Sequence, residues 1–129
     1  MPIVIDGSAL AEVVLRSERA AAVERVFEGE DLFAPDIVNA EVLSVVRSLL
    51  IREQIDGRTA ERAVQNLTRA PVQRLTTGGL IAQIWSLHRD VTPYDATYVA
   101  LAARLDAPLL TLDRRLAMAP GLPVEVRTA

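Results

Sequence analysis

The pattern of apolar and polar positions predicts a chain in which short strands alternate with longer helices. Short runs rich in apolar and β-branched residues predict strands at residues 3–5, 32–34, 72–75, 108–112 and 124–126. Apolar residues that recur every three or four positions predict helices at residues 9–27 with a break near Ser17, 36–53, 60–67, 80–88, 92–105 and 113–118. Clusters of Gly, Pro and Asp between these runs predict turns.

This alternation predicts the fold class. Parallel strands need long crossover connections, which are usually helical. We therefore expect an α/β protein, a three-layer sandwich with a central, mostly parallel sheet of about five strands. Functional sites of such sheets lie at the carboxyl ends of the strands. Because Asp6 and Asp113 directly follow two predicted strands, we expect both carboxylates at the same edge of the sheet.

Length and composition narrow the classes of protein that fit. A chain of 129 residues is expected to form one domain, residues 1–129. The chain has no cysteine and no lysine, which excludes disulfides, thiolate zinc sites, cysteine nucleophiles, the phosphate-loop lysine and Schiff-base chemistry. The net charge of −3 does not favour general nucleic-acid binding, although a local arginine patch can still attract phosphate. Without a signal peptide or an apolar run of membrane-spanning length, we expect a cytoplasmic protein that contacts no membrane.

Three acids follow predicted strands or begin predicted helices, so each also has an ordinary structural explanation. Asp6 can shape the turn at Gly7, where Ser8 can cap the following helix. Asp95 lies three residues after Thr92, in the position of an acid in the first turn of a capped helix. Asp113 can cap the last helix. Capping alone would therefore account for these three carboxylates.

Glu41 is harder to explain in this way. It lies inside the helix predicted at residues 36–53, with Ile37 and Val45 on the same side. A carboxylate among apolar neighbours is costly unless it is paired or binds a metal. If the predicted sheet brings Asp6, Glu41, Asp95 and Asp113 together, their repulsion calls for a divalent cation, and oxygen ligands suit Mg²⁺ or Mn²⁺.

Four segments carry a resemblance to a known family: residues 3–10, 38–42, 92–102 and 110–116. In this order and spacing they resemble PIN domains, and in particular the VapC toxins of prokaryotic toxin–antitoxin pairs. The resemblance covers essentially the whole chain. Its most specific part is Thr-Pro-Tyr-Asp at residues 92–95 followed by Leu-Thr-Leu-Asp at residues 110–113.

The resemblance implies an endoribonuclease that depends on Mg²⁺, with Mn²⁺ as the alternative ion. Its catalytic and metal-binding acids would be Asp6, Glu41, Asp95 and Asp113. Water activated by the metal would hydrolyse RNA and leave 5′-phosphate and 3′-hydroxyl ends. The resemblance also implies a homodimer and a VapB-like antitoxin that covers the acidic pocket.

Four further residues are assigned to the site. Ser8 and Thr111 match positions where such proteins often carry a hydroxyl near the acids, which implies a supporting catalytic role. Arg114 and Arg115 are candidates for binding the RNA backbone or an antitoxin carboxylate. The chain departs from the family at Gly7, where a small hydroxyl residue or alanine is common, and in lacking a further acid just after Asp113. The second departure puts a second tightly bound metal ion in doubt.

Other functions were weighed against the same residues. A haloacid-dehalogenase-like phosphatase needs a second acid two residues after the first, where this chain has Ser8, and usually a lysine. A receiver domain also needs the missing lysine. A catalytically silent α/β protein-interaction module, whose acids serve only as helix caps, remains the alternative.

Overall fold

A five-stranded parallel sheet forms the centre of the protein in a computed structural model that describes residues 1–129. The strands lie in the order β3-β2-β1-β4-β5, and every neighbouring pair is parallel. Their bounds are β1 Pro2–Ile5, β2 Asp31–Pro35, β3 Val72–Leu75, β4 Leu109–Leu110 and β5 Val126–Arg127. The predicted fold class, an α/β sandwich around a parallel sheet, is confirmed.

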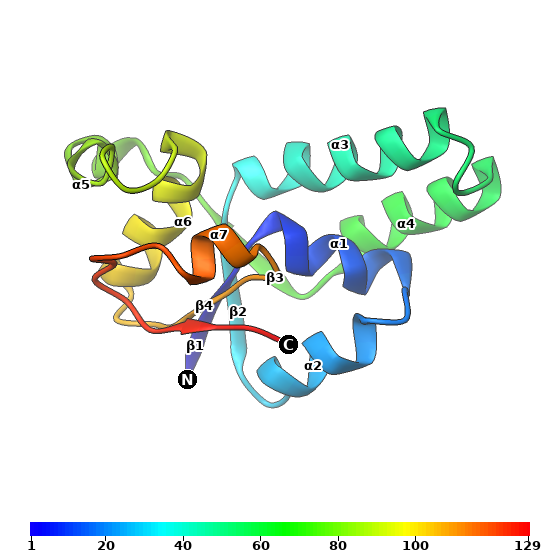
Figure 1. The fold of residues 1–129 in the computed structure, drawn as a ribbon. Helices are drawn as coiled ribbons and strands as arrows, with labels where there is room; N and C mark the ends of the chain where they lie inside the picture. The colour runs from blue at the N-terminus through cyan, green and yellow to red at the C-terminus, as the bar shows by residue number, and fades with distance from the viewer.

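Helices flank the sheet on both sides (Figure 1). Their bounds are α1 Gly7–Leu15, α2 Ala20–Phe27, α3 Ile37–Ile51, α4 Gly57–Arg69, α5 Ile81–Ser86, α6 Pro93–Arg104 and α7 Arg114–Ala117, with a 3-10 turn η1 at Gly78–Leu80. In Figure 1, α1 to α4 lie to the right of the strands, whereas α5 and α6 lie to the left. No helix is both long and apolar enough to cross a lipid bilayer.

Strand β1 and helix α6 lie at the centre of the core, which all the layers of the fold help to form. Ile3, Val4 and Ile5 are buried, as expected for a central parallel strand covered on both faces. In α6 every residue from Ala96 to Ala102 is buried, and the helix packs on β1, β2 and β4. Helix α6 is therefore held rigidly at the middle of the sheet, and its first turn lies at the carboxyl ends of the strands.

The strand order places a topological switch point between β1 and β4. The chain continues from β1 through α1 and α2 to β2 on one side, and from β4 through α7 to β5 on the other. Connections that diverge from neighbouring parallel strands leave a crevice at the carboxyl edge, where ligands of open α/β sheets bind. Asp6 ends β1 and Asp113 begins α7, so the two acids border this crevice.

Several element boundaries differ from the sequence-based prediction. The break near Ser17 is confirmed, because Arg16 takes a left-handed conformation (φ 52°) and ends α1. Strand β4 is shorter than predicted, because the chain after Leu110 turns toward the cap of α7. The last strand was predicted at residues 124–126, but β5 pairs through Val126 and Arg127 with β4. The helix predicted at residues 80–88 is a 3-10 turn followed by the short α5.

Candidate active site

Asp6 is the most buried carboxylate of the protein, with 5% of its surface exposed. It ends β1 and caps α1, because its Oδ1 accepts a hydrogen bond from the Ala9 amide at 3.0 Å. The predicted capping role of Ser8 is therefore wrong: Asp6 is the cap, and Ser8 lies inside the first turn. The reason is geometric, since the residue with extended backbone before the helix is Asp6.

The hydroxyls of Ser8 and Thr111 both donate to Asp6. Ser8 Oγ donates to Asp6 Oδ1 at 2.6 Å, and Thr111 Oγ1 donates to Asp6 Oδ2. Each hydroxyl also accepts a backbone amide from the β4 side: Leu112 N donates to Ser8 Oγ and Asp113 N donates to Thr111 Oγ1, both at 3.0 Å. A hydroxyl has only one proton to donate. Because the Ser8 and Thr111 hydroxyls both donate theirs to Asp6, both orient its carboxylate.

Glu41 reaches the same crevice from the first half of α3. It lies against the backbone of Gly7, where an added Cβ would be 3.0 Å from both Glu41 Cβ and Glu41 Oε2. Glu41 is half-buried, as its apolar neighbours predicted, and its Oε1 is buried without a hydrogen-bond partner. Neither a cap nor a salt bridge accounts for this carboxylate.

Asp95 lies in the first turn of α6. Thr92 caps this helix, since its Oγ1 accepts a hydrogen bond from the Asp95 amide at 3.2 Å, and Pro93 occupies the first turn as predicted. Asp113 caps α7 by accepting from the Arg115 amide at 2.9 Å. The capping roles predicted for these segments are confirmed, and they leave carboxylate oxygens free for other ligands.

Asp6, Glu41 and Asp95, here termed the inner acids, perturb one another. Burial raises the pKa of each carboxyl and is the largest cause at all three. Repulsion adds to it, because the charge of Asp95 raises the pKa of Asp6, and both of these acids raise the pKa of Glu41. The hydroxyls of Ser8 and Thr111 and the Ala9 amide oppose the shift at Asp6. Three like charges held in a half-buried crevice favour binding of a cation.

Asp113 affects one of the inner acids. Burial is the largest cause of the raised pKa of Asp95, and the charge of Asp113 adds to it, whereas Asp113 does not contribute to the shifts of Asp6 or Glu41. The Asp113 backbone is nevertheless linked to Asp6, because its amide donates to Thr111 Oγ1, which in turn donates to Asp6.

No three acidic or histidine side chains converge on one point that would hold a metal ion as they stand. The donor set nevertheless fits a hard divalent cation in its chemistry, since it consists of carboxylate oxygens with raised pKa values. The half-buried Glu41 carboxylate indicates the same need, because neither a helix cap nor a salt bridge compensates its charge. Asp6, Glu41 and Asp95 would be the ligands, with Asp113 at the rim.

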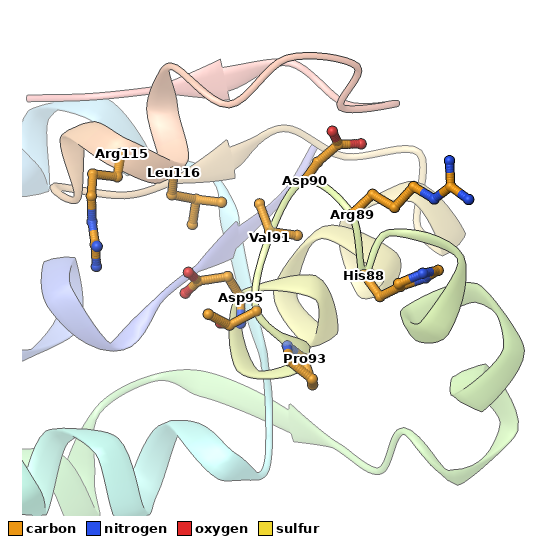
Figure 2. A pocket seen from close by; sticks show the side chains of 9 residues that line it. His88, Arg89, Asp90, Val91, Pro93, Asp95, Arg115 and Leu116 are labelled. Atoms are coloured by element: carbon orange, nitrogen blue, oxygen red, sulfur yellow. The ribbon is translucent and has the colours of Figure 1, made fainter.

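A cavity of about 410 Å³ opens beside Asp95. It is lined by residues 88–93 together with Asp95, Arg115 and Leu116. In Figure 2 the Arg115 side chain of α7 extends toward Asp95, whereas Arg89 and His88 extend away from it. The Arg115 charge lowers the pKa of Asp95, against the larger effects of burial and of Asp113. A cation and an acid on one wall suit a phosphate ester that approaches the inner acids.

The two arginines assigned to the substrate differ in position. Arg115 lines the cavity, but Arg114 does not, and neither forms a salt bridge. Sequence reasoning missed the cavity wall at residues 88–93, because a loop between α5 and α6 carries no periodic pattern. Tyr98 is buried in the core, but its hydroxyl has no hydrogen-bond partner. Trp85 is 64% exposed and lies outside the core.

One family model, a known relative and two solved structures match most of the chain. Residues 3–122 match the family model described as PIN domain. The chain is 38% identical to Ribonuclease VapC1 of Mycobacterium tuberculosis over 126 residues, which cover 96% of this chain and 95% of that protein. Among solved structures, it is similar to M. tuberculosis VapC20, a Sarcin-Ricin loop cleaving toxin (TM-score 0.68, 20% identity, 97% of this chain and 98% of that chain). It is equally similar to VapBC2 from Rickettsia felis bound to a DNA fragment from their promoter (TM-score 0.68, 13% identity, 100% and 99%).

Proposed function

Since the chain belongs to the VapC-like members of the PIN-domain family, we propose that it is a metal-dependent endoribonuclease. The observation that carries the proposal is the group of inner acids, which follow β1 or lie in α3 and α6, and whose pKa values are raised by burial and by the charges of neighbouring acids. Helix capping explains Asp6, and Asp95 lies in the first turn of a helix that Thr92 caps, but capping does not explain Glu41. A catalytically silent module therefore accounts for the site less well.

The cofactor in this proposal is Mg²⁺, with Mn²⁺ as a substitute. When bound, such an ion supplies Lewis-acid stabilisation of the phosphodiester and lowers the pKa of water. Asp6, Glu41 and Asp95 would hold it, and Asp113 would accept a proton or orient water at the rim. Ser8 and Thr111 keep both oxygens of Asp6 oriented through the hydrogen bonds described above.

The proposed substrate is RNA, and the proposed reaction is hydrolysis of its phosphodiester bonds. Arg115 supports this assignment, because it brings a positive charge to the cavity beside Asp95 without a carboxylate partner. Its guanidinium can bind a backbone phosphate in a bidentate way and so orient the scissile bond. Arg114 lies outside the cavity and is proposed to contact the RNA further along the strand.

The proposed partners are a VapB-like antitoxin and a second copy of the chain. Exposed apolar side chains on α3 and α4 support a protein partner: Leu43, Val45, Leu50, Ile51 and Val64. A second exposed set lies on α5 and just after α7: Ile81, Trp85 and Met118. We propose that these surfaces take the antitoxin and the second copy, and a cytoplasmic location stays a prediction.

Cleavage of RNA with and without metal tests the proposed function. We expect the wild type to cut structured RNA in Mg²⁺ or Mn²⁺ and EDTA to abolish the reaction. Asp6→Asn and Asp95→Asn should each reduce the rate by about 10²-fold or more while circular dichroism shows the fold intact. Undiminished cleavage by the double variant would show that the inner acids are not the site. Absence of both metal binding and cleavage in the wild type would favour the silent module.

A further inference from the structure

Two buried side-chain atoms in the protein lack a hydrogen-bond partner, and they belong to neighbouring groups. These atoms are Glu41 Oε1 and Tyr98 Oη. Tyr98 is 1% exposed, so water does not replace the missing bond. Burial raises the pKa of both groups; beyond burial, the Tyr98 phenol lowers the pKa of Glu41 and the Glu41 carboxylate raises that of Tyr98. An unpaired hydroxyl donor therefore lies close to an unpaired oxygen of one of the inner acids, Glu41.

Unpaired buried polar groups are rare because each costs about 1 to 3 kcal/mol. A hydroxyl can donate one proton and accept at the same time. The Gly7 amide, at the free amino end of α1, also acts on the Tyr98 hydroxyl and opposes its pKa shift. Tyr98 Oη thus has the Gly7 amide and the Glu41 carboxylate nearby, without a formed hydrogen bond to either.

The backbone of Gly7 lies directly against the Glu41 side chain. A Cβ on residue 7 would lie 3.0 Å from Glu41 Oε2, a separation that would push the carboxylate away. Helices α1 and α3 pack directly on one another, so a shift of Glu41 has little room elsewhere. The backbone of Gly7 and the hydroxyl of Tyr98 therefore confine the Glu41 carboxylate on two sides.

We propose that Tyr98 is a positioning residue, whose hydroxyl donates a hydrogen bond to Glu41 Oε1 when the site is loaded and leaves Oε2 to bind the metal. The inference rests on the proposed function, because it assigns a role toward the same cation. Hydrogen bonds to ligating carboxylates orient them, and loss of such a bond costs about 10- to 100-fold in metal affinity.

Calorimetric titration with Mn²⁺ at constant pH tests this role. Tyr98→Phe keeps the buried ring and removes only the hydroxyl, so we expect about 10-fold weaker Mn²⁺ binding. Tyr94→Phe is the matched control, since Tyr94 lies on the same helix, is 70% exposed, and should leave the affinity unchanged. The melting temperature of Tyr98→Phe in EDTA should equal or exceed that of the wild type, because the hydroxyl is unpartnered without metal.

A double-variant comparison separates positioning from a general structural effect. In a Glu41→Gln background, Tyr98→Phe should cause no further loss of Mn²⁺ affinity, because the hydroxyl acts through Glu41. Gly7→Ala, which displaces Glu41 by a different route, should weaken binding even with Tyr98 intact. Equal Mn²⁺ affinity of Tyr98→Phe and a binding-competent wild type overturns this inference alone, and so does an equal loss in the Glu41→Gln background. A wild type that binds no Mn²⁺ overturns the proposed function as well.

Discussion

The hydroxyl of Thr111 donates a hydrogen bond to Asp6 although 105 residues of sequence separate them. The contact exists because β1 and β4 are neighbours, so that the residues following both strands meet at the switch point. Thr111 is fully buried, and its amide continues the ladder by donating to Arg127 O at 3.0 Å. The pairing of β1 with β4 therefore determines how Asp6, the most buried acid, is oriented.

Thr111→Val is expected to weaken Mn²⁺ binding by about 10-fold, because the near-isosteric valine keeps the packing but leaves Asp6 Oδ2 without its donor. The free energy of unfolding should fall by about 1 to 2 kcal/mol. Thr97→Val is the matched control, since Thr97 is also buried but donates to Pro93 O within α6. It should lower stability and leave Mn²⁺ affinity intact; equal losses of affinity in both variants would argue against a specific role for Thr111.

Asp95→Asn should stabilise the metal-free protein. Burial and the charge of Asp113 raise the pKa of Asp95, so that at neutral pH its charge opposes folding. We expect a rise in melting temperature of about 2 to 5 °C in EDTA, together with loss of the stabilisation that Mn²⁺ gives the wild type. Asp36→Asn is the control, because Asp36 precedes α3, is exposed, and makes no capping bond. A lower melting temperature for Asp95→Asn would mean that its interaction with the start of α6 outweighs the repulsion.

The sequence was sufficient to predict the fold class, the strands and the approximate helices, whereas the roles of the four acids stay predictions. It succeeded because residues 3–5 and 108–112 are apolar and each run ends at an acid or shortly before one. It could not rank the acids, since their burial and the charges around them depend on how β1, α3, α6 and α7 pack. The sequence also could not predict that the Tyr98 hydroxyl lacks a hydrogen-bond partner. An apolar helix pattern places a tyrosine in the core but does not show which groups lie near its oxygen. Similarly, nothing in the sequence indicates that Gly7 lies against Glu41.

The stability of the metal-free protein should depend on pH through Glu41. Its pKa in the folded state lies above the ordinary value of 4.5, chiefly because of burial. Folding therefore favours the protonated form, and this contribution is present at acid pH and is lost as pH rises from about 4.5 through the raised pKa. Glu41→Gln removes the titration, so its melting temperature minus that of the wild type should increase between pH 4 and pH 7 in EDTA. A difference that stays constant or shrinks would contradict the burial of an unpaired carboxylate.

Arg115→Ala should weaken RNA binding about equally for different sequences and reduce the slope of log affinity against log salt by about 1. The reason is that Arg115 lines the cavity beside Asp95 and has no carboxylate partner. Binding can be measured by fluorescence anisotropy with Asp6→Asn protein, so that the RNA stays uncut. Arg104→Ala at the opposite end of α6 serves as control and should leave the slope unchanged. An unchanged slope for Arg115→Ala would show that Arg115 does not contact an RNA phosphate.

The central claim is that the inner acids form one metal site. Anomalous diffraction from a crystal soaked in Mn²⁺ tests it most directly, because the signal locates the ion without reference to activity. We predict a single strong peak within about 2.0 to 2.6 Å of carboxylate oxygens from Asp6, Glu41 and Asp95. Absence of a peak in the crevice between β1 and β4, or a peak held by other residues, would contradict the account.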